Sequence, residues 1–300
     1  MLDFRVETFL AVCRHMNFTK AARELNITQP AVSHHIHYLE QTYGTALFQH
    51  NGKRLQLTEA GEILRRTLLT MKHDEQHLQK RMQQAASGTR DYSFGATLSV
   101  AEFMINEALG RFLQLHPDSH IQMQVADTKV LLSKLDSGEL DFAVVEGDFP
   151  KAEYDFFVFG TEEYVAAGDP EKAACYRGRR LTDLLVEPLL LREEGSGTRV
   201  ILEYYLKEHG LAAADFARTV EIGNIGAIKT LLKSGYGVSF LYRAAIRPEE
   251  AAGTLGVIEL SDFRLRHDIM FLFPKNSNFR ADYTAIFREL RACAEETGSA

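Results

Sequence analysis

The chain has 300 residues and is weakly acidic, with a formal net charge of −7 at pH 7. Hydrophobic residues make up 45% and charged residues 25%, proportions typical of a globular protein rather than a disordered chain. The sequence has no apolar run of membrane length and no basic-then-apolar leader, so we expect a cytoplasmic protein. Its three cysteines form no CxxC pair, which argues against a disulfide-rich secreted domain.

Charge is unevenly distributed along the chain. Residues 1–58 carry six Lys or Arg against four acids, and residues 59–90 carry the same numbers, so each segment has a net charge of +2. The remaining 210 residues hold 22 bases and 33 acids. A nucleic acid would therefore be accepted by the amino-terminal end and repelled by the larger part.

The most informative segment is 18–40, FTKAARELNITQPAVSHHIHYLE, which predicts two short helices joined by a tight turn. Thr28 is placed to cap the second helix, and Gln29 and Pro30 fit its first turn. One face of this helix is apolar at i, i+4, i+7 positions, namely Val32, Ile36 and Leu39. Its other face is short and polar, which suits entry into the major groove of DNA, although an ordinary helical hairpin is the alternative.

The flanking segments complete a small domain. An apolar stripe at helical spacing predicts a preceding helix that completes a three-helix core, and it consists of Val6, Phe9, Leu10 and Cys13. Residues 47–58, LFQHNGKRLQLT, predict a β-hairpin with Asn51 and Gly52 in its turn. Lys53 and Arg54 lie beside that turn, where they can contact phosphates or the minor groove. The predicted unit is a winged helix-turn-helix.

The residues predicted to bind DNA are polar or lie at the start of the second helix or on the wing. They are Thr19, Thr28, Gln29, Pro30, Ser33, His34, His37, Lys53 and Arg54. His34 and His37 are one helical turn apart and also admit a metal site, but two ligands are incomplete and no cysteine accompanies them, so we expect no metal. Because a charge of +2 is modest, we expect paired copies of the domain on DNA.

Residues 58–86 predict a long helix that pairs two chains. Positions spaced 4, 3, 4, 3, 4, 3 form a heptad seam broken by one charge, in the order Leu64, Leu68, Met71, Glu75, Leu78, Met82 and Ala85. The predicted dimerisation residues are its large apolar members, Leu64, Leu68, Met71, Leu78 and Met82. A helix packed on its own chain is the alternative. Ser87, Gly88 and Thr89 predict the helix end and a flexible joint.

From about residue 91, β-rich runs alternate with amphipathic helices, which predicts an α/β part large enough for two lobes. The expected strands are 93–96, 121–125, 142–145, 156–159, 164–167, 189–191, 220–222, 238–241, 257–260 and 269–273. The expected helices include 100–115, 130–137, 199–209 and 228–233.

Ligands of such sheets bind beyond the carboxyl ends of strands, where helix amino termini present free amides. Three segments fit this description: 96–99, which carries two hydroxyls, 192–199, REEGSGTR, and 223–226. We expect a small anionic or polar molecule there, held by amides and hydroxyls rather than by a metal. Simple helix capping is the alternative at each place.

The sequence argues against catalysis. Gly195, Ser196 and Gly197 suggest a nucleophile turn, but the required G-x-S-x-G spacing is absent. The sequence also contains no GxGxxG, GxxxxGK or HExxH motif. A peroxide-sensing disulfide between Cys175 and Cys293 is a further alternative, which the sequence favours less.

Several motifs occur together and in a fixed order: FxxV at 9–12, FTKAARELNITQPAVS, LE at 39–40, LF at 47–48 and LTEAGE at 57–62. This part resembles the amino-terminal half of LysR-type transcriptional regulators. The resemblance extends more loosely to the whole chain. It rests there on the GSGT-type loop, the Thr and Ser pair after the first strand, and KTLLKSGYGVSFL at 229–241. Family members commonly carry arginine or glutamine in place of His34 and arginine in place of His50.

The resemblance implies a winged helix-turn-helix at 1–58, a linker helix and hinge at 59–90, and an effector-binding domain at 91–300. The last would have two lobes like those of periplasmic solute-binding proteins, lobe I at about 91–162 and 266–300 and lobe II at about 163–265. The implied effector pocket is lined by Thr97, Ser99, Glu146, Ser196, Gly197, Thr198 and Asn224.

The implied protein is a homodimer or homotetramer that binds double-stranded operator DNA and responds to a small-molecule co-inducer, with no other cofactor. The alternative is a solute-binding protein or enzyme of the same two-lobed fold with a non-regulatory helical domain, which would leave residues 1–90 unexplained.

Overall fold

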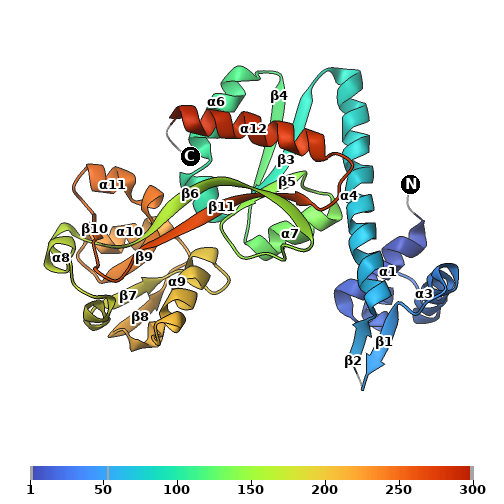
Figure 1. Cartoon of the computed structure of the whole chain (residues 1–300), viewed down its shortest axis with the longest axis horizontal. Helices are drawn as coiled ribbons and strands as arrows, with labels where there is room; N and C mark the ends of the chain where they lie inside the picture. Colours follow the sequence, from blue (N-terminus) through green and yellow to red (C-terminus); the bar gives the residue numbers. More distant parts are fainter. Residues whose placement is uncertain (1–2, 53, 298–300) are drawn as a thin grey trace.

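The structure is a computed structural model that describes residues 3–52 and 54–297. Figure 1 shows a small head, one long helix and a two-lobed α/β domain, which follow one another along the chain. This is the fold class that the sequence predicts. Lys53, one of the residues predicted to bind DNA, lies outside the described residues.

Three helices form the core of the head. Helix α1 spans Phe4–His15, α2 spans Phe18–Glu24 and α3 spans Gln29–Tyr43. The Thr28 hydroxyl accepts a hydrogen bond from the amide of Ala31, so the predicted cap of α3 is confirmed. The predicted apolar stripes meet in one core, whose members exposed by 8% or less include Val6, Phe9, Leu10, Val32, Ile36 and Leu39.

The wing is an antiparallel hairpin of β1, Phe48–Asn51, and β2, Arg54–Leu57. Asn51 pairs with Arg54, so Asn51 ends the first strand and is not a turn residue, which corrects the prediction. Gly52 follows with a φ of +61°, a conformation that glycine adopts without a steric penalty.

The long helix, α4, spans Glu59–Ser87. The Thr58 hydroxyl caps its first turn by accepting from the amide of Gly61, and Gly88 ends it with a φ of +74°. Strand β3 begins at Arg90, so only Gly88 and Thr89 separate the helix from the α/β domain.

The first half of α4 belongs to the head. Leu68 is only 4% exposed and lies in the head core, and Leu64 packs against that core. The prediction that Leu68 forms part of an open dimerisation seam is therefore wrong, because side chains of the same chain already cover it. Met71, Leu78 and Met82 are 47%, 47% and 67% exposed and stay available to a partner.

The second half of α4 docks on lobe I through polar side chains. The Asp74 carboxylate accepts hydrogen bonds from the Ser277 hydroxyl at 2.5 Å and from the backbone and side-chain nitrogens of Asn278 at 2.9 and 2.8 Å. The buried ring of His73 donates through Nε2 to the Leu140 carbonyl at 2.9 Å. Because burial lowers the pKa of His73 to about 4, this imidazole is neutral at pH 7. The alternative of a helix packed on its own chain thus holds for this face.

Lobe I is a sheet covered on both faces by helices (Figure 1). Its strands run in the order β4, β3, β5, with parallel pairing of β3 to both neighbours. The strands are β3, Arg90–Ala96, β4, Ser119–Val125, and β5, Phe142–Val145. The helices are α5, Leu98–Phe103, α6, Asn106–Leu115, α7, Thr128–Ser137, and α12, Arg280–Thr297.

Lobe II repeats the pattern on the other side of the molecule. Strand β7 pairs in parallel with β8 and β9, and β10 pairs with the end of β6. The strands are β7, Pro188–Leu191, β8, Arg218–Glu221, β9, Val238–Tyr242, and β10, Gly256–Ile258. The helices are α8, Pro170–Cys175, α9, Gly197–Glu208, α10, Ile225–Lys233, and α11, Arg247–Ala251.

Two long antiparallel strands join the lobes: β6, Tyr154–Gly168, and β11, Leu265–Pro274. The two strands predicted at 156–159 and 164–167 are one strand, because cross-strand pairing continues through the polar stretch between them, as at Thr161, whose hydroxyl donates to Asp268 at 2.7 Å. The helix predicted at 100–115 is instead two, since Met104 and Ile105 turn into the core between them.

The first turn of α4 contains a glycine, Gly61, because no side chain fits at this position. A Cβ at this position would lie 2.1 Å from the carbonyl oxygen of Leu47 and 2.8 Å from a methyl carbon of Leu57. Helix α4 therefore approaches the start of the wing too closely for any side chain at this point.

We expect Gly61→Ala to lower the free energy of unfolding of the head by about 1–3 kcal/mol, because the backbone must shift to relieve the clash. Thermal unfolding followed by circular dichroism measures this. Gly110→Ala in α6 is the control, because a Cβ there meets nothing within 4 Å. Equal melting temperatures for the two variants would contradict the prediction.

Candidate functional sites

The polar face of α3 is open to solvent. Thr28, Gln29, Pro30, His34 and His37 are exposed there and Ser33 is half-buried, while Thr19 is exposed on α2. The Gln29 side chain donates to the Ser33 hydroxyl at 2.9 Å, and His37 contacts Gln41 at 2.9 Å. These groups therefore interact with one another but are not covered by the rest of the chain.

His35 differs from its neighbours. Its Nδ1 lies 2.9 Å from the hydroxyl of Thr8, so it joins α3 to α1 inside the head. Among the described residues, no group of three or more His, Cys, Asp or Glu is arranged to hold a metal ion.

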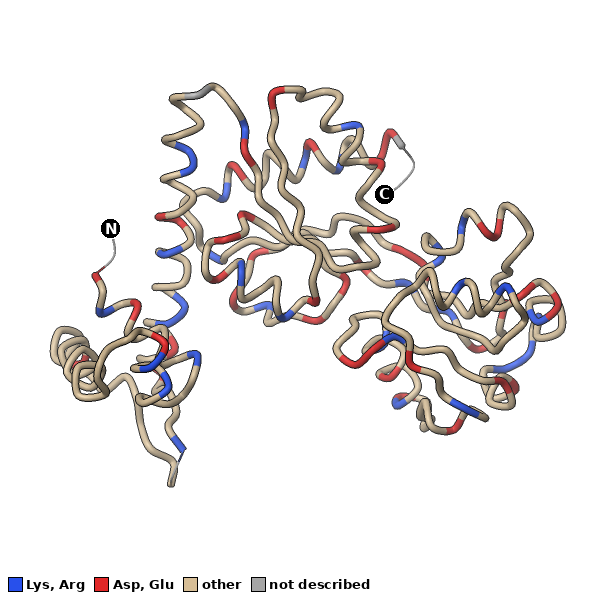
Figure 2. The backbone as a smooth tube through the Cα atoms, turned by 180° about the vertical axis from the view of Figure 1, so that it is seen from behind, with Lys and Arg blue, Asp and Glu red and all other residues tan. Residues whose placement is uncertain are grey.

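Basic side chains gather on the head and along α4. Figure 2 shows Lys and Arg repeated down this helix, whereas acidic residues are more frequent in the two lobes. Arg54, on the second strand of the wing, is exposed. The exposed polar face of α3 and the wing thus lie on the part of the molecule best suited to approach a polyanion.

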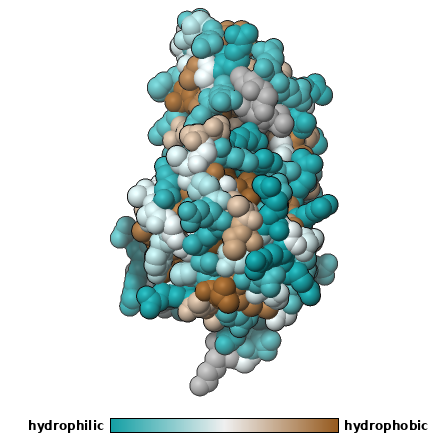
Figure 3. Space-filling model, turned by 90° about the vertical axis from the view of Figure 1, so that its left-hand side faces the viewer, coloured by the Kyte–Doolittle hydropathy of each residue, from teal (hydrophilic) through white to brown (hydrophobic). Residues whose placement is uncertain are grey.

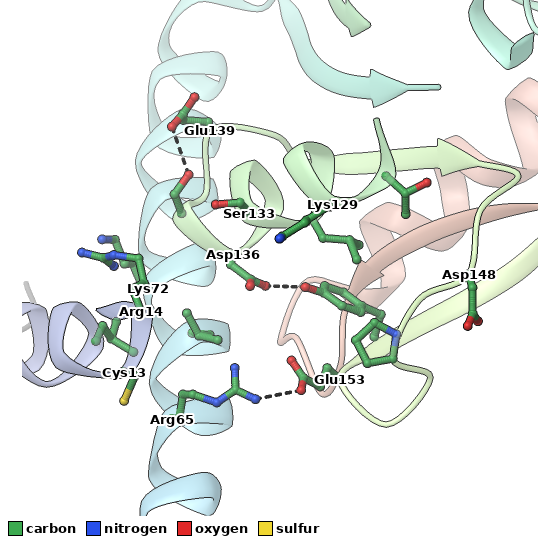
Figure 4. Close-up of a pocket in the computed structure, with 17 residues that line it drawn as sticks. Cys13, Arg14, Arg65, Lys72, Lys129, Ser133, Asp136, Glu139, Asp148 and Glu153 are labelled. Carbon is green, nitrogen blue, oxygen red and sulfur yellow. Dashed lines mark hydrogen bonds and ion pairs between the residues drawn. The ribbon is translucent and has the colours of Figure 1, made fainter. Parts of the chain in front are cut away.

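A cavity of about 700 Å³ separates the head from lobe I (Figure 4). Arg65 of α4 reaches across it and donates to the Glu153 carboxylate at 2.7 Å. On the side of the lobe, the Tyr154 hydroxyl donates to Asp136 at 2.7 Å, and burial raises the pKa of that carboxyl to about 6. No sequence pattern predicted this junction, because its walls come from α1, α4, α7 and the segment before β6.

Most of the predicted effector residues come together where the lobes meet. Thr97 and Ser99 follow β3 in lobe I, and Ser196 and Thr198 stand at the start of α9 in lobe II, all exposed by 4% or less. The hydroxyls of Ser99 and Thr198 are 3.2 Å apart and bridge the lobes. We call these four residues, with Glu146 and Gly197, the interlobe cluster.

Glu146 is the acidic member of the interlobe cluster. It follows β5, is 2% exposed and accepts a hydrogen bond from the Thr97 hydroxyl. Burial raises the pKa of its carboxyl to about 7 and nearby Asp127 adds to the rise, while Arg192 and hydrogen bonds, including one from Ser99, oppose it.

Asn224 does not join this cluster. It is exposed, and its side-chain oxygen accepts from the amide of Ala227 at 2.9 Å, so it caps α10. Here the capping alternative is correct, and the assignment of Asn224 to the pocket is withdrawn.

Two residues that the sequence did not single out support the cluster. Arg192, 4% exposed, directly follows β7 and forms two hydrogen bonds to the Glu193 carboxylate at 2.7 and 2.6 Å. The Tyr164 hydroxyl, on crossing strand β6, lies 2.8 and 3.0 Å from the carbonyl oxygens of Thr198 and Phe240, and either can accept its single proton. A charged residue directly after an apolar strand was the one available signal for Arg192.

The three cysteines lie in different parts of the molecule, and Cys13 lines the cavity between the head and lobe I. Burial raises the pKa of Cys13 to about 12, which keeps this thiol protonated. Cys175 on α8 and Cys293 on α12 lie on different lobes and are not joined by a disulfide.

Comparison with known families accounts for both halves of the chain. Residues 5–62 match the bacterial regulatory helix-turn-helix protein family of the lysR type, and residues 86–294 match the LysR substrate binding domain. The chain belongs to the LysR family. It is a LysR-type DNA-binding transcriptional regulator with an effector-binding domain.

Curated relatives of this LysR-type regulator align over most of their length. The RuBisCO operon transcriptional regulator of Acidithiobacillus ferrooxidans is 28% identical over 305 residues, covering 97% of this chain and 94% of that protein. The regulator CfxR of Cupriavidus necator is 30% identical over 272 residues, covering 86% and 80% of the two chains.

Solved structures of LysR-type regulators share the fold. Full-length LysG from Corynebacterium glutamicum with bound effector Arg has a TM-score of 0.62 at 18% identity and covers 99% of both chains. The regulatory domain of CcmR from Synechocystis in complex with 2-PG has a TM-score of 0.60 at 20% identity, covering 68% of this chain and 97% of that one. Among the described residues, no helix combines the length and the apolar character that crossing a membrane requires.

The wild-type protein should lose unfolding free energy as pH rises because Glu146 becomes charged, and we expect Glu146→Gln to abolish this loss. Because the folded-state pKa is about 7 against an ordinary 4.5, the wild-type carboxyl is stabilising in its protonated form, and this contribution is lost as pH rises from about 4.5 to 7. Relative to Gln, the wild type should lose on the order of 3 kcal/mol of unfolding free energy between pH 4.5 and 8.

Urea unfolding of both proteins at several pH values measures this difference. Glu171→Gln, at an exposed position of α8, is the control and should show no such trend. A difference between wild type and Glu146→Gln that stays constant across this range would show that burial does not act on the carboxyl as described.

Proposed function

We propose that this regulator reads its operator with the polar face of α3, positions itself with the wing, and receives its signal at the interlobe cluster. The observation that supports operator reading most directly is the exposure of the α3 face on a tightly packed head. A helix held in this way can present side chains to base edges in the major groove at low entropic cost.

Within this surface the proposed roles differ. Gln29, in the first turn of α3, has the amide geometry to pair with adenine, and Ser33, His34 and His37 extend the contact along the same face. Thr28 and Pro30 set the conformation at the start of α3, and Thr19 on α2 contacts the sugar-phosphate backbone of the DNA. Arg54, with Lys53, contacts phosphate or the minor groove beside the bases that α3 reads.

The substitutions Gln29→Ala and Arg54→Ala should weaken binding in different ways. Gln29→Ala should cost about 1–3 kcal/mol at one base position only, because it removes a contact to a base edge. Arg54→Ala should weaken binding to every sequence alike and flatten the slope of log affinity against log salt by about one unit. Gel shifts on an operator selected from genomic fragments, and on its single-base variants, separate the two. Identical behaviour would contradict the assignment of roles.

We propose that two copies pair through the exposed face of α4. Ile63, Met71, Leu78 and Met82 are between 47% and 67% exposed, an unusual number of large apolar side chains for one face of a helix. These exposed side chains can pack against a second α4 as in a coiled coil. By contrast, the end of lobe II visible in Figure 3 is largely hydrophilic, with apolar groups scattered over it.

Met82→Glu should therefore weaken the dimer at least about tenfold, because it places a charge in an apolar contact. Sedimentation equilibrium measures the association. Gln79→Glu, which adds the same charge at a neighbouring exposed position of α4, is the control. A dimer unaffected by Met82→Glu would remove this face from the interface.

The proposed signal is a small-molecule co-inducer that binds between the lobes and needs no further cofactor. The interlobe hydroxyls, the first turn of α9 and the crossing strands bring together donors from both lobes, which supports this location. The solved structures of LysG and CcmR contain Arg and 2-PG, so this fold holds ligands of different charge. A ligand that favours one arrangement of the lobes shifts DNA affinity, and by reciprocity the operator shifts ligand affinity equally.

Finally, we propose that the chain acts by binding alone, as a homodimer or homotetramer on double-stranded DNA, without catalysis. Its curated relatives are named as transcriptional regulators, which supports this proposal. We also propose a cytoplasmic location, because a regulator of this kind must reach the DNA that it binds.

A further inference from the structure

The carboxyl of Glu146 lies directly on the boundary between the lobes. Glu146 directly follows β5 of lobe I, and Gly197 is the first residue of α9 in lobe II. A Cβ built on Gly197 would lie only 3.3 Å from Glu146 Oε1. The carboxyl therefore packs on the backbone at the amino terminus of a 12-residue helix.

This position has the chemistry of an anion site. The Thr97 hydroxyl donates to Glu146, and the Ser99 and Thr198 hydroxyls stand 3.2 Å apart beside it. Free amides and hydroxyl donors at a helix amino terminus favour a negatively charged group. The chain thus fills this place with a carboxylate of its own, and a small anion from solution would have to compete with it.

The surrounding charges do not leave a cation free for a second anion. Arg192 is buried beside the cluster, but Glu193 already occupies its guanidinium through two hydrogen bonds. Asp127, at the start of α7, approaches the backbone of Gly195 on the facing loop, where a Cβ would lie 3.7 Å from its carboxylate. A dianion that entered between the lobes would meet the carboxylates of the buried Glu146 and the exposed Asp127, which would both repel it.

We propose that Glu146 determines effector specificity: it excludes small dianions from the interlobe site and requires the effector to present a positively charged nitrogen to its carboxylate. A buried carboxylate without a matched cation is costly, and an ammonium or guanidinium group on the ligand would supply that match. The effector class is therefore an amine or a guanidine. This inference rests on the proposed location of the effector between the lobes.

The test uses the full-length protein and two sets of probes at pH 8 and constant ionic strength. The cationic set is L-arginine, L-lysine and putrescine, and the dianionic set is sulfate and inorganic phosphate, which is largely HPO4²⁻ at pH 8. Thermal shift identifies binding and titration calorimetry measures it, for the wild type, Glu146→Gln and Glu146→Thr. Glu171→Gln, an exposed carboxylate on α8, is the matched control.

We expect at least one cationic probe, and neither dianion, to bind the wild type and the control. Glu146→Thr should weaken the cationic probe at least about tenfold and strengthen a dianion by a similar factor. Retention of DNA binding in a gel shift shows that each variant is folded. Dianion binding to the wild type at pH 8, absence of any cationic hit, or unchanged affinities in Glu146→Thr would each overturn the proposal.

Sulfate adds a pH test, because its charge is constant between pH 6 and 8. In the wild type, sulfate affinity should rise as pH falls from 8 to 6, since Glu146 has a pKa of about 7 and loses its charge. Glu146→Gln should bind sulfate with no such trend. Arg192, Glu193, Asp127 and Tyr242 are present in both proteins, so their contributions cancel in the comparison.

These outcomes also separate the proposal from the one on which it rests. A dianion that binds Glu146→Thr but not the wild type places the effector between the lobes whether or not a cationic probe is found. If dianions and amines bind the wild type and all variants equally, the effector site lies elsewhere.

Discussion

The arrangement of this regulator depends on one helix that is built into two folded units at once. The first half of α4 places Leu68 in the core of the head, and its second half places the Asp74 carboxylate against Ser277 and Asn278 of lobe I. A buried carboxylate with three hydrogen bonds is strongly destabilised when those partners are lost. The head therefore cannot turn relative to lobe I without breaking a core contact or uncovering this charge.

This constraint decides where a signal can act. Because α4 holds the head on lobe I, the part of one chain that can change position is lobe II. Strands β6 and β11 connect lobe II to lobe I, and the interlobe cluster lies where the two lobes meet. In the proposed dimer joined along α4, a change in lobe II would alter how the two chains fit together and hence the spacing of the two α3 helices. The cavity spanned by Arg65 and Glu153 marks the remaining gap between head and lobe I.

The sequence predicted the parts of the molecule that local signals determine. The Thr28 cap and the stripes of α1 and α3 are short-range patterns, so the head was foreseen almost completely. Tertiary context decided the rest: cross-strand pairing carried β6 through the polar stretch around Thr161, and lobe I covered His73 and Asp74, which the sequence alone would place in solvent. Helix α12 was missed although its buried positions follow helical spacing, among them Tyr283, Ile286, Leu290 and Ala294. The hydroxyls of the interlobe cluster were predicted, but the partners of Glu146 depend on how the lobes close.

Chemical footprinting of histidines tests most directly whether α4 is docked on lobe I. Diethyl pyrocarbonate modifies accessible imidazoles, and mass spectrometry gives the rate at each histidine of the native full-length protein. Docking predicts that His73 and His77, which are 1% and 8% exposed, react at least about tenfold more slowly than the exposed His37 and His50. Rates for His73 and His77 equal to those of His37 and His50 would show that α4 stands free of lobe I and would contradict the account.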